Sequence, residues 1–131
     1  MVVNLPDGAV TTTGQIGETL YECDGYTVVL QTLEGGDLNR TVQAVTGYPA
    51  DRLQLIQWSK DGVKRYDGVF TAAGEESLQV GRTCILDDGG YHYALTTLAS
   101  EELSGQLQEQ WKELYATLRL VDAQMDLNTG S

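Results

Sequence analysis

The chain has 131 residues and a formal net charge of −11, from 19 acidic and 8 basic residues. This length is typical of one domain, and its recurring apolar residues exclude a disordered chain. The charge opposes binding to nucleic-acid phosphates or anionic lipids, because both need clustered cations. No stretch approaches the ~20 apolar residues that cross a bilayer, so no transmembrane segment is expected.

Residues 1–18 show weak patterning, and we expect an irregular N-terminal arm with one edge strand around residues 9–13. The arm lacks the basic and apolar regions of a signal peptide. We therefore expect a cytoplasmic protein, or an extracytoplasmic one in its mature form.

A hairpin follows, because Asp24-Gly25 separates two strand-like runs over residues 20–23 and 26–33. Glycine tolerates the positive φ that a type I′ turn requires. A short helix is then predicted over residues 37–46. Asp37 is a good N-cap residue, and Gly47 suits the position after the last helical turn.

Four more strands are predicted, over residues 53–58, 63–72, 78–86 and 91–98. The loops between them are short, as between antiparallel neighbours. Ser100 is predicted to cap a C-terminal helix that ends near residue 118 and has one apolar stripe: Leu103, Leu107, Trp111, Leu114, Tyr115 and Leu118.

These elements predict an α+β fold in the order β-β-α-β-β-β-β-α, within a single globular domain over residues 19–121. About six strands form an antiparallel sheet, with the long C-terminal helix on one face and the short helix on the other. Strands 53–58 and 63–72 carry apolar residues on both sides, which favours a sheet covered on both faces. Residues 122–131 are predicted to be a flexible polar tail.

Few residues suit catalysis. His92 is the only histidine, it lies between two tyrosines in a predicted strand, and no serine lies in a nucleophile elbow. We interpret His92 as structural, and a small hydrolase using it as a general base is the less favoured alternative. Asp87 and Asp88 lack the spacing of a calcium loop, and no glycine-rich phosphate motif is present. We therefore predict no enzyme activity, no metal and no cofactor.

Cys23 and Cys84 are the only cysteines, and each lies in a predicted strand. Two buried free thiols are the favoured interpretation. A disulfide between them is the alternative, and it would require an oxidising compartment.

Tyrosine is the common aromatic residue here, with seven tyrosines against one phenylalanine. Tyrosines are favoured both in sheet packing and at interfaces. We predict a binding surface on the sheet that carries Tyr66, Tyr91 and Tyr93, with His92 beside them.

Residues 88–96 (DGGYHYALT) precede a helix with Trp111 and a closing ATLRL at 116–120, and this pattern resembles the end of PsbP-like domains. The helix of residues 41–47, placed before a strand, is also similar to small bacterial proteins of that type. The resemblance spans roughly residues 20–121. It implies an α/β/α sandwich in a secreted or lipid-anchored protein that binds other proteins without catalysis.

The function predicted from the sequence is therefore a non-catalytic interaction domain at the bacterial cell envelope. Its partner would be a protein or an envelope component, and its location extracytoplasmic or secreted. The alternative is an acidic chaperone-like dimer in the cytoplasm.

Overall fold

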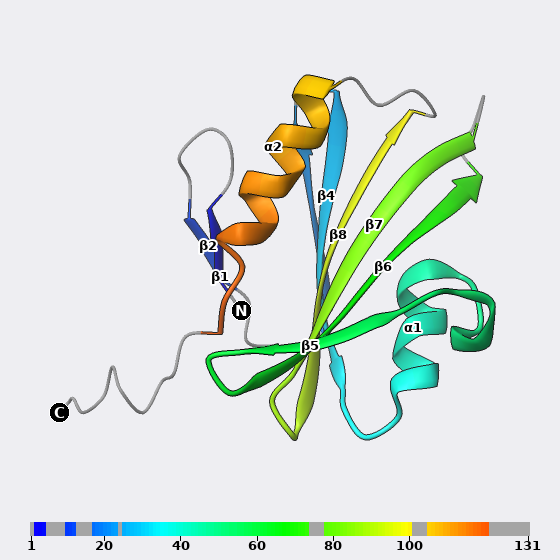
Figure 1. Cartoon of the computed structure of the whole chain (residues 1–131), viewed down its shortest axis with the longest axis vertical. Coiled ribbons are helices and arrows are strands. Elements are labelled where there is room, and N and C mark those ends of the chain that lie inside the picture. The colour runs from blue at the N-terminus through cyan, green and yellow to red at the C-terminus, as the bar shows by residue number, and fades with distance from the viewer. Residues whose placement is uncertain are drawn as a thin grey trace, which may run out of the picture.

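The computed structural model describes residues 2–4, 10–12, 17–23, 25–73, 78–100 and 105–120. Its elements, shown in Figure 1, are β1 (Val2–Asn4), β2 (Val10–Thr12), β3 (Gly17–Cys23), β4 (Tyr26–Glu34), α1 (Leu38–Thr46), the 3-10 turn η1 (Ala50–Arg52), β5 (Ile56–Lys60), β6 (Val63–Ala73), β7 (Leu78–Asp87), β8 (Tyr91–Ser100) and α2 (Gly105–Ala116). From β3 onward the strands and α-helices follow the predicted order. The α+β class is confirmed.

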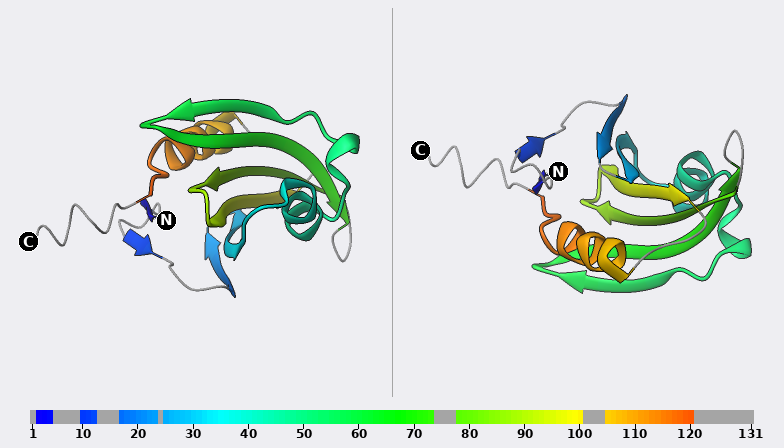
Figure 2. Two further views of the ribbon diagram at one scale, coloured as in Figure 1. Left: turned by 90° about the horizontal axis from the view of Figure 1, so that it is seen from below. Right: turned by 90° about the horizontal axis from the view of Figure 1, so that it is seen from above.

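The main sheet has six strands in the order β3-β4-β8-β7-β6-β5, and all neighbours are antiparallel. The antiparallel sheet is therefore confirmed. β4 pairs with β8 over its whole length, although α1 and three strands separate them in the chain. β3 and β5 are the edges. Figure 2 shows that the sheet twists strongly, so that β3 and β5 lie on opposite sides of α2.

The two helices pack against opposite faces of the sheet. In β7, Cys84 and Leu86 belong to the core formed with Trp111 of α2, whereas Ile85 belongs to the core formed with Val42 of α1. Successive residues of a strand point to opposite faces, so this alternation assigns one helix to each face. Central positions of β7 and β8 are consequently buried on both sides. The prediction of a sheet covered on both faces agrees with this packing.

The ends of α1 are the ones its sequence predicts. The side chain of Asp37 accepts a hydrogen bond from the Arg40 N–H at 3.2 Å. Gly47 has a φ of 82°, and its N–H donates to the Gln43 carbonyl at 2.9 Å. Both helix ends are thereby satisfied, and the helix is limited to 9 residues.

Two predicted boundaries are wrong. The strand expected at 53–58 begins only at Ile56, because residues 50–52 form a 3-10 turn and Leu53 packs beneath α1. The strand expected at 91–98 extends to Ser100, which pairs with Gln79 of β7, and the prediction that Ser100 caps a helix depends on residues 101–104, which lie outside the described ranges. The described part of the last helix begins at Gly105 and has 12 residues.

The N-terminal residues contribute to the core. β1 and β2 pair with each other rather than with the main sheet. Val3 of β1 is fully buried in the core beneath α2. The predicted tail, residues 122–131, lies outside the described residues. No helix within the described ranges is long and apolar enough to cross a membrane.

Candidate interaction surface

The three tyrosines expected to share a surface lie on opposite faces of the sheet. Tyr66 pairs with Ile85 on the face covered by α1, where it is partly buried. Tyr91 and Tyr93 point to the other face, and their ring centroids are 6.3 Å apart. The structure therefore brings only Tyr91 and Tyr93 together, and a surface carrying all three tyrosines is not formed.

The carboxylates beside these tyrosines shape the β7–β8 turn. Asp88 Oδ1 accepts the N–H groups of Gly90 and Tyr91 at 2.9 and 2.7 Å, and its other oxygen accepts the Tyr93 hydroxyl at 2.9 Å. Burial raises the pKa of Asp88, but these hydrogen bonds outweigh burial and hold the pKa below its usual value. Burial and the hydrogen bond to Asp88 raise the pKa of Tyr93 to about 12. The side chains of Asp88 and Tyr93 thus both stabilise the β7–β8 turn.

His92 is enclosed between α1 and the sheet and is only 2% exposed. Its Nδ1 lies 2.5 Å from the Thr41 hydroxyl of α1, and its Nε2 lies 3.7 Å from the Asp87 carboxylate. The imidazole therefore links α1 to β8. This position gives no support to the alternative in which His92 acts as a general base, because a substrate could not reach the ring.

Neither cysteine forms a disulfide, and Cys84 is buried whereas Cys23 is only partly buried. Cys23 is level with Tyr26, Ala99 and Val80 across the sheet, whereas Cys84 is four residues further along β7. Their strands are separated by β4 and β8, which corresponds to roughly 14 Å between Cα atoms even without that offset. A disulfide needs Cα atoms within about 7 Å, so this geometry excludes one. Burial raises the pKa of the Cys84 thiol to about 12.

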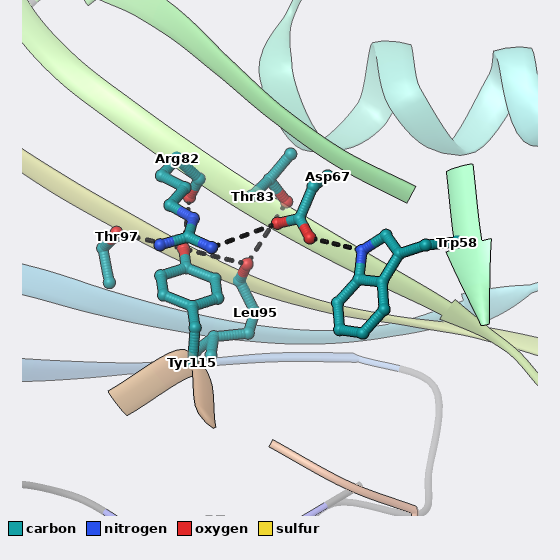
Figure 3. Close-up of polar contacts among 7 residues, drawn as sticks. All are labelled: Trp58, Asp67, Arg82, Thr83, Leu95, Thr97 and Tyr115. Carbon is teal, nitrogen blue, oxygen red and sulfur yellow. Dashed lines mark hydrogen bonds and ion pairs between the residues drawn. The ribbon is translucent and has the colours of Figure 1, made fainter. Parts of the chain in front are cut away.

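A polar cluster lies at the β5–β6 side of the sheet (Figure 3). Asp67 of β6 lies at its centre. The indole N–H of Trp58 donates to Asp67 Oδ2 at 2.7 Å, and a guanidinium nitrogen of Arg82 lies 3.5 Å from Oδ1. These contacts join three neighbouring strands.

Two arginine–aromatic contacts support this cluster. The guanidinium of Arg82 lies 4.0 Å from the ring centroid of Tyr115, whose hydroxyl donates to the Arg82 carbonyl. Burial raises the pKa of Tyr115 well above its ordinary value, so the hydroxyl stays protonated. The buried guanidinium of Arg65 lies 5.3 Å from the Trp58 ring centroid and donates to the Leu118 carbonyl at 3.0 Å. The side chains are thus held in place by α2 and its C-terminal extension.

Exposed apolar side chains surround the cluster. Ile56 pairs with Asp67 across the strands, Val69 pairs with Arg82, and each of these apolar side chains is 67% exposed. Trp58 is 39% exposed. A groove of about 520 Å³ runs along Ile56 and Val69. We call Ile56, Trp58, Asp67, Val69 and Arg82 the β5–β6 patch.

The chemistry of this patch suits binding. It combines an aromatic ring, a guanidinium and aliphatic side chains, and it contains no serine, cysteine or histidine that could act as a nucleophile. No group of acidic, histidine or cysteine side chains within the described ranges could hold a metal ion. None of the five residues of this patch was predicted from the sequence to form a site. The only feature of the sequence that pointed to this patch was the presence of apolar residues on both sides of strands 53–58 and 63–72.

No protein-family model matches the chain, and no curated protein is significantly similar to it. The resemblance to PsbP-like domains accordingly stays a prediction.

Proposed function

We propose that this chain is a non-catalytic interaction domain that binds a protein at the bacterial cell envelope through the β5–β6 patch. The observation that carries the proposal is the exposure of Ile56 and Val69 around an ordered Asp67–Arg82 pair. Large contiguous apolar patches on the surface of a monomeric protein mark interaction sites. Tryptophan and arginine are also the residues most enriched among binding hot spots.

Preorganisation supports the same proposal. Trp58 and Arg82 are each fixed by a contact to Asp67, and each also stacks with a second side chain. Ordering a free side chain on binding costs about 0.5–1.5 kcal/mol, and groups that are already ordered avoid this cost. Location outside the cytoplasm rests on the resemblance to PsbP-like domains, and the free thiols are compatible with either compartment.

The test is affinity capture from envelope and cytoplasmic fractions of the source organism, with quantitative mass spectrometry. The baits are wild type, the double variant Ile56→Asp/Val69→Asp and the control Tyr91→Ser. Tyr91 is 44% exposed and lies in the surface predicted from the sequence, away from the patch. Circular dichroism should show that all three baits are folded.

We expect an envelope protein that is recovered by wild type and Tyr91→Ser and lost by the double variant. Equal recovery by all three baits would refute the β5–β6 patch as the contact surface. Loss with Tyr91→Ser alone would return the assignment to the tyrosine surface. Specific partners found only in the cytoplasmic fraction would refute the envelope location.

A further inference from the structure

A second surface lies on the opposite face of the sheet, between α1 and the edge strand β3. Two adjoining hollows of about 460 and 290 Å³ share Glu18, Gln31 and Ala44 in their linings. We call them together the α1–β3 groove. Ala44 is exposed on α1, and its small side chain keeps the groove open on the helix side.

The floor of the smaller hollow is apolar. It is formed by Val29, Leu98 and Phe70 from three different strands, and Leu20 of β3 stands at its rim. Leu20 is 56% exposed and pairs across the strands with Val29. A Cβ added at Gly81 would lie 2.5 Å from the Phe70 ring, so the absence of a side chain there is what lets the ring lie across β7.

The rim of the groove is an edge strand. Among the described strands, β3 pairs only with β4. The backbone of an edge strand is the usual template for an added strand of another chain. The side chains of Glu18, Leu20 and Glu22 alternate onto the face that carries the groove, and all three are exposed.

The charge of β3 points to the partner. Glu18 and Glu22 flank Leu20 on the same face of β3, and Glu34 also lines the groove, where Arg40 of α1 is the one basic side chain among the described lining residues. An added strand places its own side chains directly opposite Glu18, Leu20 and Glu22, with Cβ atoms about 5 Å apart. Opposite charges in such cross-strand positions stabilise pairing, and like charges destabilise it.

We propose that the exposed edge of β3, which forms the rim of the α1–β3 groove, binds an extended basic segment of a partner protein, which adds to the sheet as a seventh strand. Its motif is a basic, an apolar and a second basic residue at alternate positions. The basic side chains pair with Glu18 and Glu22, and the apolar side chain packs on Leu20. This surface is distinct from the β5–β6 patch, so either proposal can fail without the other.

The test uses a nine-residue peptide with blocked ends, in which lysine, valine and lysine at alternate central positions are separated by threonines. One control peptide has glutamates in place of the lysines, and a second has the same composition with the two lysines adjacent. Binding is measured by calorimetry. The site is mapped by backbone amide shifts and hydrogen exchange in the full-length wild-type protein.

We expect the largest shifts in β3, and slower exchange of β3 amides in the complex. Glu18→Lys/Glu22→Lys should weaken binding by at least about tenfold, because it creates like-charge contacts. Leu20→Ser should weaken it as well, and added salt should weaken it by screening. Ile56→Asp on the opposite edge strand is the matched control, and it should bind like wild type.

The inference would be overturned by absence of binding at millimolar peptide, by equal binding of the glutamate or adjacent-lysine peptide, or by shifts that map to β5 instead of β3. Binding that survives the charge reversal would overturn it too. In that case Glu18 and Glu22 would serve only to protect the edge strand against aggregation.

Discussion

Trp111 provides the sharpest test of how α2 is attached to the sheet. Its side chain is 4% exposed and lies in the core with Leu95 and Cys84. Its ring meets Tyr26 edge-on, with centroids 5.9 Å apart. The indole N–H, however, has no hydrogen-bond partner among the described residues. Substitution of Trp111 therefore removes one unfavourable feature together with several favourable ones.

The expected loss follows from these contacts. Replacing a buried tryptophan by alanine costs about 3–5 kcal/mol through lost burial and the cavity that remains. The edge-on contact with Tyr26 adds about 0.5–1.5 kcal/mol. Removing an unsatisfied buried N–H increases the free energy of unfolding by about 1–3 kcal/mol. For Trp111→Ala we therefore expect a decrease of about 3 kcal/mol in the free energy of unfolding. Trp111→Phe removes the N–H and keeps most of the packing, so its decrease should stay below about 1.5 kcal/mol.

The measurement is urea denaturation followed by far-UV circular dichroism, because the substitution itself changes tryptophan fluorescence. Linear extrapolation gives the free energy of unfolding of each variant. A loss under about 1 kcal/mol for Trp111→Ala would mean that α2 does not pack as described. An equal loss for phenylalanine and alanine would refute the packing contribution of the ring, because both variants lack the indole N–H.

Three further predictions use the same assays. Gly81→Ala should destabilise by about 1–3 kcal/mol through its contact with Phe70, and a much smaller loss in the Phe70→Ala background would confirm the cause. The folded-state pKa of Asp88 is lowered, so its charge contributes stability above about pH 4 that is lost as the pH falls through that lowered pKa. Asp88→Asn should therefore destabilise at neutral pH and have no effect in strong acid, and an equal effect at both would contradict the assignment. Cys84 should react with a thiol reagent only on unfolding and Cys23 earlier, and a melting temperature lowered by reductant would contradict free thiols.

Local signals in the sequence predict much of the fold. The N-cap Asp37 and the positive-φ Gly47 define α1, because each meets a backbone requirement within one helical turn. Gly25, with a φ of 87°, marks the β3–β4 hairpin for the same reason. These positions depend on residues a few places away in the chain. Their structural consequences can therefore be recognised without knowing the tertiary fold.

Features that depend on distant pairing could not be predicted in this way. The strand expected to end at residue 98 continues to Ser100, because Ser100 pairs with Gln79 of β7. The faces of Tyr66 and Tyr93 depend on the register of β6 with β7 and of β7 with β8. The cluster at Asp67 likewise draws residues from three strands and α2. No sequence spacing encodes these contacts.

The lengths of the elements explain why both faces of the sheet keep exposed apolar side chains. With 12 residues, α2 is about 18 Å long, and α1 with 9 residues is about 14 Å long. β6 and β7, with 11 and 10 residues, extend over roughly 33–36 Å. The described part of each helix is therefore only about half as long as these strands, or less. The uncovered parts of the two faces include Val69 on the α2 face and Leu20 on the α1 face, both more than half exposed. One cause thus yields two separate surfaces, and lengthening α2 over Val69 should bury the β5–β6 patch while the α1–β3 groove stays open.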